Sequence, residues 1–275
     1  MMANKLMLSI NGVKYHVQLQ GVGQPVLLLH GFTGSMNTWN TFIQDYKHCF
    51  QFISLDLLGH GLTEAPIDPD RYEMQKAAKD IKDILIALNI QSAHILGYSM
   101  GGRLALGFAV LYPEFVRTLI LESSSPGLEH EGERLSRAHS DAQLAERIRE
   151  YGIDSFVDDW EKIPLFASQE RLSNGKKAEI RQERVSHTSI GLQNSLMGMG
   201  TGSQPSFWSE LKEVDFPVLL LAGALDKKFV QLALKMQNCL NRCQFETIND
   251  TGHAIHVEEP KIFGRIVSEF IRGRN

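Results

Sequence analysis

Residues 93–102 read Ala-His-Ile-Leu-Gly-Tyr-Ser-Met-Gly-Gly, and this stretch decides the fold. Its first five residues form a short apolar run that favours a buried strand. From Gly101 to Tyr112 the chain is rich in Gly, Ala and Leu and predicts a helix, which ends before Pro113. Ser99 therefore lies at a junction between a strand and a helix.

The pattern Gly97-x-Ser99-x-Gly101 suits a serine that a reactant must reach. A tight turn between strand and helix projects the hydroxyl and leaves almost no room for side chains at the flanking positions. By composition alone such a pentapeptide arises in about one chain in ten of this length, so its position at the junction gives it weight. A serine hydroxyl is unreactive near neutral pH, so it needs a histidine to take its proton and a carboxylate to orient that histidine.

Further apolar runs predict a sheet around this junction. Buried strands are predicted at residues 25–30, 51–56, 116–121, 218–222 and 244–248, and helices at 39–46, 72–88 and 260–271. Two segments, 6–10 and 13–19, flank Asn11-Gly12, a dipeptide that favours a tight hairpin between antiparallel edge strands. This alternation predicts an α/β protein with a mostly parallel sheet flanked by helices.

Residues 127–208 break the alternation of strands and helices. The segment is charged, has helical periodicity, and is followed by another predicted strand. We therefore predict an inserted helical cap, with residues 1–126 and 209–275 forming the core. Glycine-rich residues 197–205 are expected to form a loop or hinge between the cap and the core.

The composition argues against several classes of partner. The 28 Lys and Arg residues are scattered among 32 Asp and Glu, for a net charge of -4, so no nucleic-acid partner is expected. The three cysteines favour neither a disulfide framework nor a zinc site, and we predict no metal. Neither a signal peptide nor a membrane-spanning run is evident, so we expect a cytoplasmic monomer or weak homo-oligomer with no membrane partner.

Two residues that follow later strands are candidates to complete the site. Asp226 comes directly after a predicted strand, which brings it to the edge where Ser99 emerges. A turn-forming aspartate is the alternative there, whereas Asp215 precedes its strand and lies at the wrong edge. His253 follows the last strand in a short glycine-flanked turn, and we prefer it to His256, which lies nearer to the terminal helix.

Backbone N–H groups beside Ser99 are candidates to stabilise negative charge on a substrate oxygen. The N–H of Met100, directly after the serine, is one donor, and the N–H of Phe32, in the loop after an earlier strand, is the second. His30 is expected to brace that loop. Residues 56–63 lack clustered ligands and the lysine of a phosphate loop, so we interpret them as structural.

Taken together, these motifs resemble the α/β-hydrolase superfamily over nearly the full chain. The motifs are His30-Gly31-Phe32, Asp56-x-x-Gly59-His60-Gly61, residues 97–102, Asp226 and Gly252-His253. The resemblance implies an α/β-hydrolase fold with a triad of Ser99, His253 and Asp226. It does not give the reaction, because this scaffold hosts esterases, C–C hydrolases, haloperoxidases and lyases.

Finer motifs resemble the 2-succinyl-6-hydroxy-2,4-cyclohexadiene-1-carboxylate synthases of menaquinone synthesis. These are residues 97–103, Glu122 with Pro126-Gly127-Leu128, Asp159-Trp160 with residues 164–168, Gln204-Pro205, and residues 226–229. The resemblance implies a cofactor-free lyase. Ser99, primed by His253, would remove a carbon-bound proton from 2-succinyl-5-enolpyruvyl-6-hydroxy-3-cyclohexene-1-carboxylate, and the enolpyruvyl substituent would leave as pyruvate.

The substrate of that family is a small anion with several carboxylates. Arginine binds a carboxylate through two parallel hydrogen bonds, and Arg103, one turn after Ser99, is well placed for this. A surface helix arginine is the alternative interpretation of Arg103. Acidic residues outnumber arginines in the cap, so individual arginines that face the pocket must attract the anion.

The resemblance adds further residues around the pocket. It implies that Tyr98 and Trp160 form walls of the pocket and that Arg134 and Arg184, from the cap, bind carboxylates. Arg137 and Arg181 lie close to these two arginines, and a shift of one helical turn in the alignment would exchange the members of each pair.

Other classes of function use the same triad. A carboxylesterase or a C–C bond hydrolase would use Ser99 as a nucleophile and form an acyl-enzyme. A catalytically silent binding protein is a third possibility, although a competent residue fills every triad position. Arg103, Trp160 and the cap arginines are the features that favour the lyase.

Overall fold

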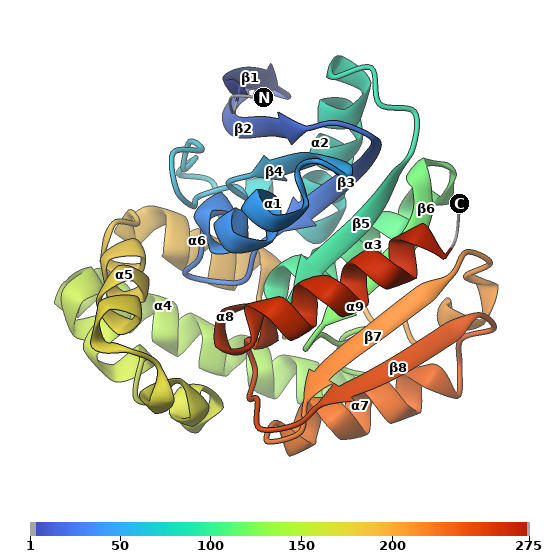
Figure 1. The fold of residues 1–275 in the computed structure, drawn as a ribbon. Coiled ribbons are helices and arrows are strands. Elements are labelled where there is room, and N and C mark those ends of the chain that lie inside the picture. Colours follow the sequence, from blue (N-terminus) through green and yellow to red (C-terminus); the bar gives the residue numbers. More distant parts are fainter. Residues whose placement is uncertain (1–3, 274–275) are drawn as a thin grey trace.

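The computed structural model describes residues 4–273, in which eight strands form one sheet of order β1-β2-β4-β3-β5-β6-β7-β8 (Figure 1). The strands are β1 (Asn4–Ile10), β2 (Val13–Gly21), β3 (Gln24–Leu29), β4 (Phe50–Leu55), β5 (Ala93–Tyr98), β6 (Val116–Glu122), β7 (Val218–Gly223) and β8 (Cys243–Ile248). β2 pairs antiparallel with β1 and β4, and every other neighbouring pair is parallel. The mostly parallel sheet predicted from the sequence is confirmed.

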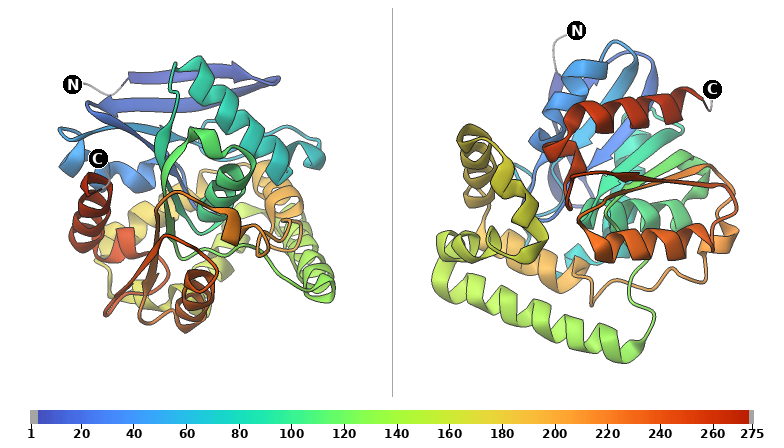
Figure 2. Two further views of the ribbon diagram at one scale, coloured as in Figure 1. Left: turned by 90° about the vertical axis from the view of Figure 1, so that its right-hand side faces the viewer. Right: turned by 60° about the horizontal axis from the view of Figure 1, so that its bottom comes forward.

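Helices cover both faces of this sheet (Figure 2). They are α1 (Asn40–Tyr46), α2 (Met74–Ala87), α3 (Met100–Leu111), α7 (Lys227–Gln237), α8 (Ile255–Glu258) and α9 (Pro260–Arg272). α1 and α9 pack on one face, and α2, α3 and α7 pack on the other. Within residues 4–273, no helix is both long enough and apolar enough to cross a membrane.

The apolar runs of the sequence become strands that are buried on both faces. In β3, Val26 and Leu28 pack with α1 and α9, whereas Leu27 and Leu29 pack toward α2 and α3. All four side chains are fully buried. Because successive side chains of a strand point to opposite faces, a continuous apolar run is needed where both faces are covered.

The predicted hairpin is present at Asn11 and Gly12, which join β1 to β2. Both residues have positive φ, 49° for Asn11 and 81° for Gly12, as a two-residue turn of the hairpin type requires. Predicted core residues 1–3 and 274–275 lie outside the described residues.

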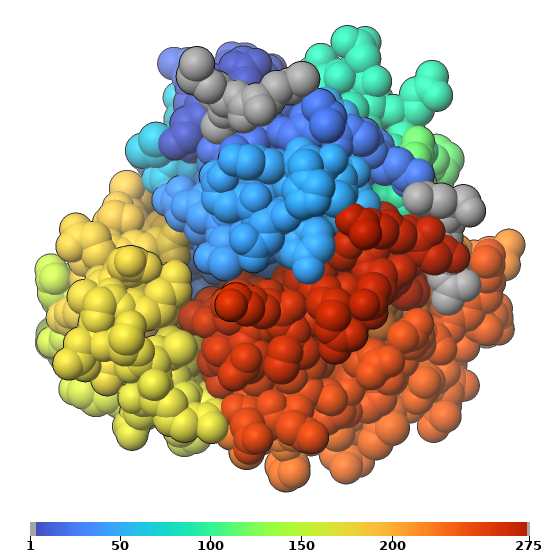
Figure 3. Space-filling view, in the orientation of Figure 1, coloured from blue at the N-terminus to red at the C-terminus, as the bar shows by residue number. Residues whose placement is uncertain are grey.

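Residues 127–208, for which we keep the word cap, connect β6 to β7. They form α4 (Glu131–Trp160), a 3-10 helix (Pro164–Arg171), α5 (Asn174–Val185) and α6 (Ser189–Met199). α4 is broken at Gly152, whose φ is 81° and ψ is 175°. Figure 3 shows part of the cap, in yellow, lying against both the blue and the red parts of the core. The hydroxyl of Ser35 in the core donates to the Glu183 carboxylate in α5 across this seam.

The expected loop at residues 197–205 is partly wrong, because α6 continues to Met199 and the turn begins afterwards. A Cβ on Gly198 would lie 2.6 Å from the Cβ of Tyr72, and one on Gly191 would lie 2.1 Å from the Gly59 carbonyl oxygen. Glycine therefore allows α6 to approach the core closely. A glycine that serves close packing looks the same in the sequence as one that serves a turn.

Candidate active site

The backbone around Ser99 forms a sharp turn between β5 and α3. Ser99 has φ 51° and ψ -110°, an uncommon conformation for a residue with a side chain. A Cβ on Gly97 would lie 2.3 Å from the Gly101 carbonyl oxygen, and one on Gly101 would lie 2.2 Å from that of Leu29. The backbone approaches so closely here that both flanking positions require glycine.

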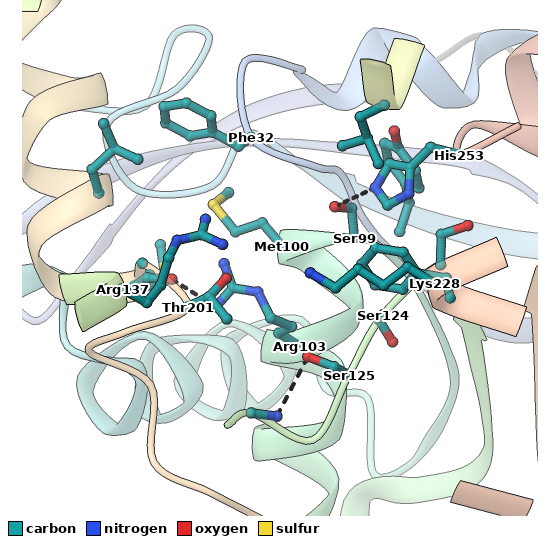
Figure 4. Close-up of a pocket in the computed structure, with 18 of the residues that line it drawn as sticks. Phe32, Ser99, Met100, Arg103, Ser124, Ser125, Arg137, Thr201, Lys228 and His253 are labelled. Carbon is teal, nitrogen blue, oxygen red and sulfur yellow. Dashed lines mark hydrogen bonds between the residues drawn. The ribbon is translucent and has the colours of Figure 1, made fainter. Parts of the chain in front are cut away.

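His253 lies between Ser99 and Asp226. Its Nε2 atom is 2.9 Å from Ser99 Oγ, and its Nδ1 atom is 2.7 Å from Asp226 Oδ2 (Figure 4). Asp226 follows β7 at the start of α7, and His253 lies in the loop between β8 and α8. With Nδ1–H donated to the carboxylate, Nε2 can accept the hydroxyl proton of Ser99. The structure therefore brings the three predicted residues into one hydrogen-bonded chain.

His256, the alternative to His253, is engaged elsewhere. Its Nδ1 atom is 2.8 Å from Glu122 Oε2, and its Nε2 atom is 2.8 Å from Thr38 Oγ1. Both partners of the His256–Glu122 pair are buried. The pair lies behind Tyr98, whose ring centroid is 4.6 Å from that of His256, so His256 is not a partner of Ser99.

The loop that carries His253 is tied to the cap by one carboxylate. Glu258 Oε2 accepts a hydrogen bond of 2.8 Å from the Gly252 N–H, and Oε1 accepts one of 2.9 Å from the Ser168 hydroxyl in the cap. A Cβ on Gly252 would lie 2.0 Å from Ser168 Oγ, so the two segments are in tight contact. Glu258 thus links the histidine loop to the cap.

His30 braces the loop that carries Phe32. Its Nδ1–H donates to the Gly31 carbonyl at 2.8 Å, and its Nε2 accepts from the Leu57 N–H at 2.9 Å. Burial lowers the pKa of His30 to about 4, so the ring is neutral at physiological pH. Phe32 and Met100 both line the cavity beside Ser99, and Met100 begins α3, where N–H groups have no partner within the helix.

A cavity of about 250 Å³ opens beside Ser99 and His253, between the strand ends and the cap. The predicted walls Tyr98 and Trp160 both line this cavity. The Trp160 ring packs edge-on against Phe32, with centroids 5.5 Å apart. The cavity is therefore shared between the core, which contributes Ser99, and the cap, which contributes Trp160.

Three cationic side chains line this cavity, namely Arg103, Arg137 and Lys228, and no Asp or Glu among residues 4–273 lines it. Arg103 is buried, and its guanidinium donates to the Met199 carbonyl and to Gln204 Oε1, each at 2.8 Å. Both acceptors are neutral. Burial, with a smaller contribution from Arg137, lowers the pKa of Arg103 to about 10. A buried cation with only neutral partners here favours an anionic ligand.

The two candidate arginines of α4 have different surroundings. Arg134 donates to the carbonyls of Leu128 and Glu129, at 3.0 and 2.8 Å, and is not among the residues that line the cavity. Arg137, one turn further along, lines the cavity and donates to Asp141 at 2.7 Å. Arg137, the alternative that the sequence leaves open, therefore lines the cavity beside Ser99, whereas Arg134 is bound to backbone carbonyls at the start of α4.

Arg184 lies outside the cavity, behind the ring of Phe166. Its guanidinium is 4.7 Å from the centroid of that ring, and its closest carboxylate contact is a 3.9 Å ion pair with Glu161. Phe166 lines the main cavity and also a smaller one that Arg184 and Tyr98 line. Arg184 is therefore separated from the main cavity by aromatic side chains.

Comparison with known proteins identifies the family. A family model described as the alpha/beta hydrolase fold matches residues 24–260. A Bacillus subtilis (strain 168) protein, provisionally named 2-succinyl-6-hydroxy-2,4-cyclohexadiene-1-carboxylate synthase, is 45% identical over 95% of this chain and 96% of its own length. The chain belongs to this synthase family of the α/β-hydrolase fold. The synthase of Salmonella paratyphi C (strain RKS4594) is 31% identical over 86% of this chain and 91% of its own.

A solved structure is also similar to this chain. The structure of MenH from S. aureus superposes with a TM-score of 0.90 and 36% identity, and the match covers 94% of this chain and 98% of that one. The fold and the family expected from the sequence are both confirmed.

Some residues at this synthase-family site were not selected from the sequence. Arg137 and Arg134 are equivalent candidates in the sequence, because two arginines three positions apart on a charged helix cannot be distinguished until the helix is oriented. Lys228 was noted only within the motif at residues 226–229. Glu258 gave no signal beyond its acidic side chain near His253.

Proposed function

We propose that the chain is a 2-succinyl-6-hydroxy-2,4-cyclohexadiene-1-carboxylate synthase that releases pyruvate from 2-succinyl-5-enolpyruvyl-6-hydroxy-3-cyclohexene-1-carboxylate in the cytoplasm. Arg103 carries the proposal, because it is a buried cation that lines the cavity with Ser99 and His253 and forms no ion pair with any described residue. The carboxylate of Asp141, which raises its pKa slightly, is paired with Arg137. The substrate bears three carboxylates, one each on the ring, the succinyl group and the enolpyruvyl group. Its charge complements a cavity that presents cations and no carboxylate.

The change of bonds follows from the structures of substrate and product. The substrate has one ring double bond, between C3 and C4, and the product has two, at C2 and C4. A proton therefore leaves C2, its electron pair forms the C2–C3 double bond, and the C3–C4 pair moves to C4–C5. The C5–O bond breaks, and the enolpyruvyl group departs and becomes pyruvate by taking up a proton at carbon.

Proton removal from C2 is assisted by the ketone of the succinyl group, because the negative charge spreads to the ketone oxygen. The N–H groups of Phe32 and Met100 are the donors that stabilise this oxygen. Donors aimed at a developing oxyanion are worth about 3–4 kcal/mol each in comparable sites. The same two groups would serve a hydrolase, so they support the chemistry without selecting the reaction.

Ser99 is the base in this proposal. Its hydroxyl proton passes to His253 Nε2 across the 2.9 Å hydrogen bond while Ser99 Oγ takes the proton from C2. Asp226, 2.7 Å from His253 Nδ1, stabilises the imidazolium that forms. No bond between Ser99 and carbon is needed, and the proton on His253 is released when the pyruvate enolate is protonated.

Arg103 and Arg137 bind substrate carboxylates in this proposal, and Tyr98 and Trp160 form the walls that hold the ring. Arg184 would reach the cavity only after the ring of Phe166 moves, so its binding role depends on that movement. Arg134 keeps its role at the helix start, where backbone carbonyls already accept its hydrogen bonds.

Pyruvate release from the enolpyruvyl substrate, wild type against Ser99→Ala, tests the substrate and the mechanism together. We expect the variant to lose at least about 10³-fold in kcat, in the range of general-base catalysis, while its Tm stays unchanged. Absence of pyruvate with the wild type, together with a mass-shifted acyl-enzyme on ester substrates, would establish the alternative, a carboxylesterase or C–C hydrolase.

A further inference from the structure

We propose that Lys228 binds the succinyl carboxylate of the substrate and thereby holds C2 against Ser99. The inference rests on the proposed function and assigns one of its three carboxylates to one side chain. It goes beyond that function because Lys228 was not among the expected binding residues.

Lys228 lines the same cavity as the triad residues Ser99 and His253. It is the second residue of α7, directly after Asp226 and Lys227. The ring of its neighbour Phe229 packs on His253, with centroids 4.7 Å apart. Figure 4 shows Lys228 on the side of Ser99 and His253, with Arg103 and Arg137 gathered on the other side of the cavity.

The charged groups around Lys228 also favour an anionic ligand. A cation in the first turn of a helix is repelled by the positive end of the helix dipole. The carboxylate of Asp226, the N-cap of α7, offsets part of this repulsion, but it is engaged by His253 Nδ1 and by the Phe229 N–H. Lys228 is exposed and forms no ion pair with any described residue, and its Nζ lies 5.7 Å from the centroid of the Phe229 ring. Lys235, further along the same helix, pairs with Glu129. An anion in the cavity would supply the counter-ion that Lys228 lacks.

The chemical structure of the substrate indicates which of its three carboxylates Lys228 binds. The succinyl ketone is bonded to C2, the carbon from which Ser99 removes the proton, and only two methylene groups separate this ketone from its carboxylate. The enolpyruvyl group is attached to C5, across the ring from C2. The ring carboxylate on C1 also lies beside C2, but it is fixed to the ring, whereas the succinyl carboxylate ends a flexible chain that can extend from C2 to Lys228. We therefore assign the succinyl carboxylate to Lys228 and the other two carboxylates to Arg103 and Arg137.

The test compares Lys228→Ala with Lys227→Ala, a matched variant of an adjacent exposed lysine that does not line the cavity. For Lys228→Ala we expect kcat/KM for pyruvate release to fall about 10- to 100-fold, mainly through KM, as for loss of a charge-assisted hydrogen bond. Lys227→Ala should change it less than about twofold, and Lys228→Arg should restore most of it. The Tm of Lys228→Ala should stay close to that of the wild type, because Lys228 is exposed and forms no ion pair with any described residue.

A substrate analogue with the succinyl carboxylate replaced by its amide identifies the group that Lys228 binds. The wild type should prefer the acid to the amide by about 10- to 100-fold, and Lys228→Ala should show little preference. Equal losses on acid and amide, or an unchanged kcat/KM in Lys228→Ala, would overturn the assignment. If the wild type released no pyruvate from either substrate, the proposed function itself would fail, which is a distinguishable result.

Discussion

The two parts of the site are held in different ways, one by the backbone at the sheet edge and one by side chains in the cap. Ser99 lies on a turn that admits only glycine at its flanks, and Asp226 and Ser99 engage the two ring nitrogens of His253. Arg137 extends from a charged helix and pairs with Asp141. The core therefore fixes the reacting groups and also contributes Arg103 and Lys228 to the cavity, whereas the contribution of the cap to substrate recognition depends on single side chains such as Arg137.

Separate replacement of the two neighbouring arginines of α4 by alanine tests the role of the cap in substrate recognition and has the largest expected effect. Arg137→Ala removes a side chain that binds a substrate carboxylate. We therefore expect kcat/KM for pyruvate release to fall about 10- to 100-fold, with a higher KM. Arg134→Ala, a matched change one turn away, removes bonds to backbone carbonyls only and should alter kcat/KM less than about threefold. Steady-state kinetics of both variants measures kcat and KM for pyruvate release. A larger loss of kcat/KM in Arg134→Ala than in Arg137→Ala would mean that Arg134, the residue expected from the sequence, binds the substrate carboxylate.

Glu258 joins the two regions, so its removal tests whether the cap helps to hold the loop that carries His253. Glu258→Ala leaves the buried Gly252 N–H and the Ser168 hydroxyl without their acceptor, and an unsatisfied buried donor costs about 1–3 kcal/mol. We expect kcat to fall about tenfold as the His253 loop loosens, with less effect on KM.

Two control variants separate positioning by Glu258 from loss of charge. Glu258→Gln keeps an acceptor for Gly252 and a group for Ser168, so it should recover most of kcat. Glu259→Ala changes the adjacent exposed carboxylate and should be neutral. A full kcat in Glu258→Ala would mean that the histidine loop is held without the cap.

What could be predicted from the sequence follows the same division. Ser99 and Asp226 follow buried strands, and His253 follows β8, an edge strand in which only Ile248 is buried. The order of strands and turns brings all three residues to one edge of the sheet. The turn at Ser99 has its own glycine spacing, and the hairpin has Asn11-Gly12. Local patterns of this kind can be interpreted without knowledge of distant contacts.

The cap could not be predicted at the same level of detail. Whether Arg134 or Arg137 faces the cavity depends on the rotation of the part of α4 before Gly152, which packs through Ala145 and Ile148 in one cluster with Leu192 of α6. Exposed ion pairs such as Arg147 with Asp159 add little stability and give no directional signal. Contacts between distant segments, which decide the orientation of these helices, leave no local pattern.

The smallest predicted effect concerns the response of the core to acid. His94 is buried in β5 between Thr118 and Gln24, and burial lowers its pKa to about 4. Because the unfolded chain binds this proton near pH 6.5 and the folded chain near 4, His94 reduces stability as the pH falls through that interval. His94→Gln should make the decline shallower, by up to about 1.4 kcal/mol per pH unit, in urea unfolding at several pH values.

Glu183 in the cap should have the opposite effect on the pH dependence of stability. Burial raises the pKa of Glu183 in α5, so protonation of this carboxyl favours the folded state as the pH falls. Glu183→Gln removes that contribution and should make the decline in stability steeper. Parallel curves for wild type and both variants would contradict the two assignments.

Deuterium at C2 of the enolpyruvyl substrate gives the most direct test of Ser99 as a base. Pyruvate release would be followed in a single turnover, with the intact mass of the enzyme recorded over the same interval. The account predicts slower release from the deuterated substrate through a primary isotope effect, with no increase in the mass of the protein. Equal rates for the two substrates, with a covalent adduct on Ser99, would contradict it.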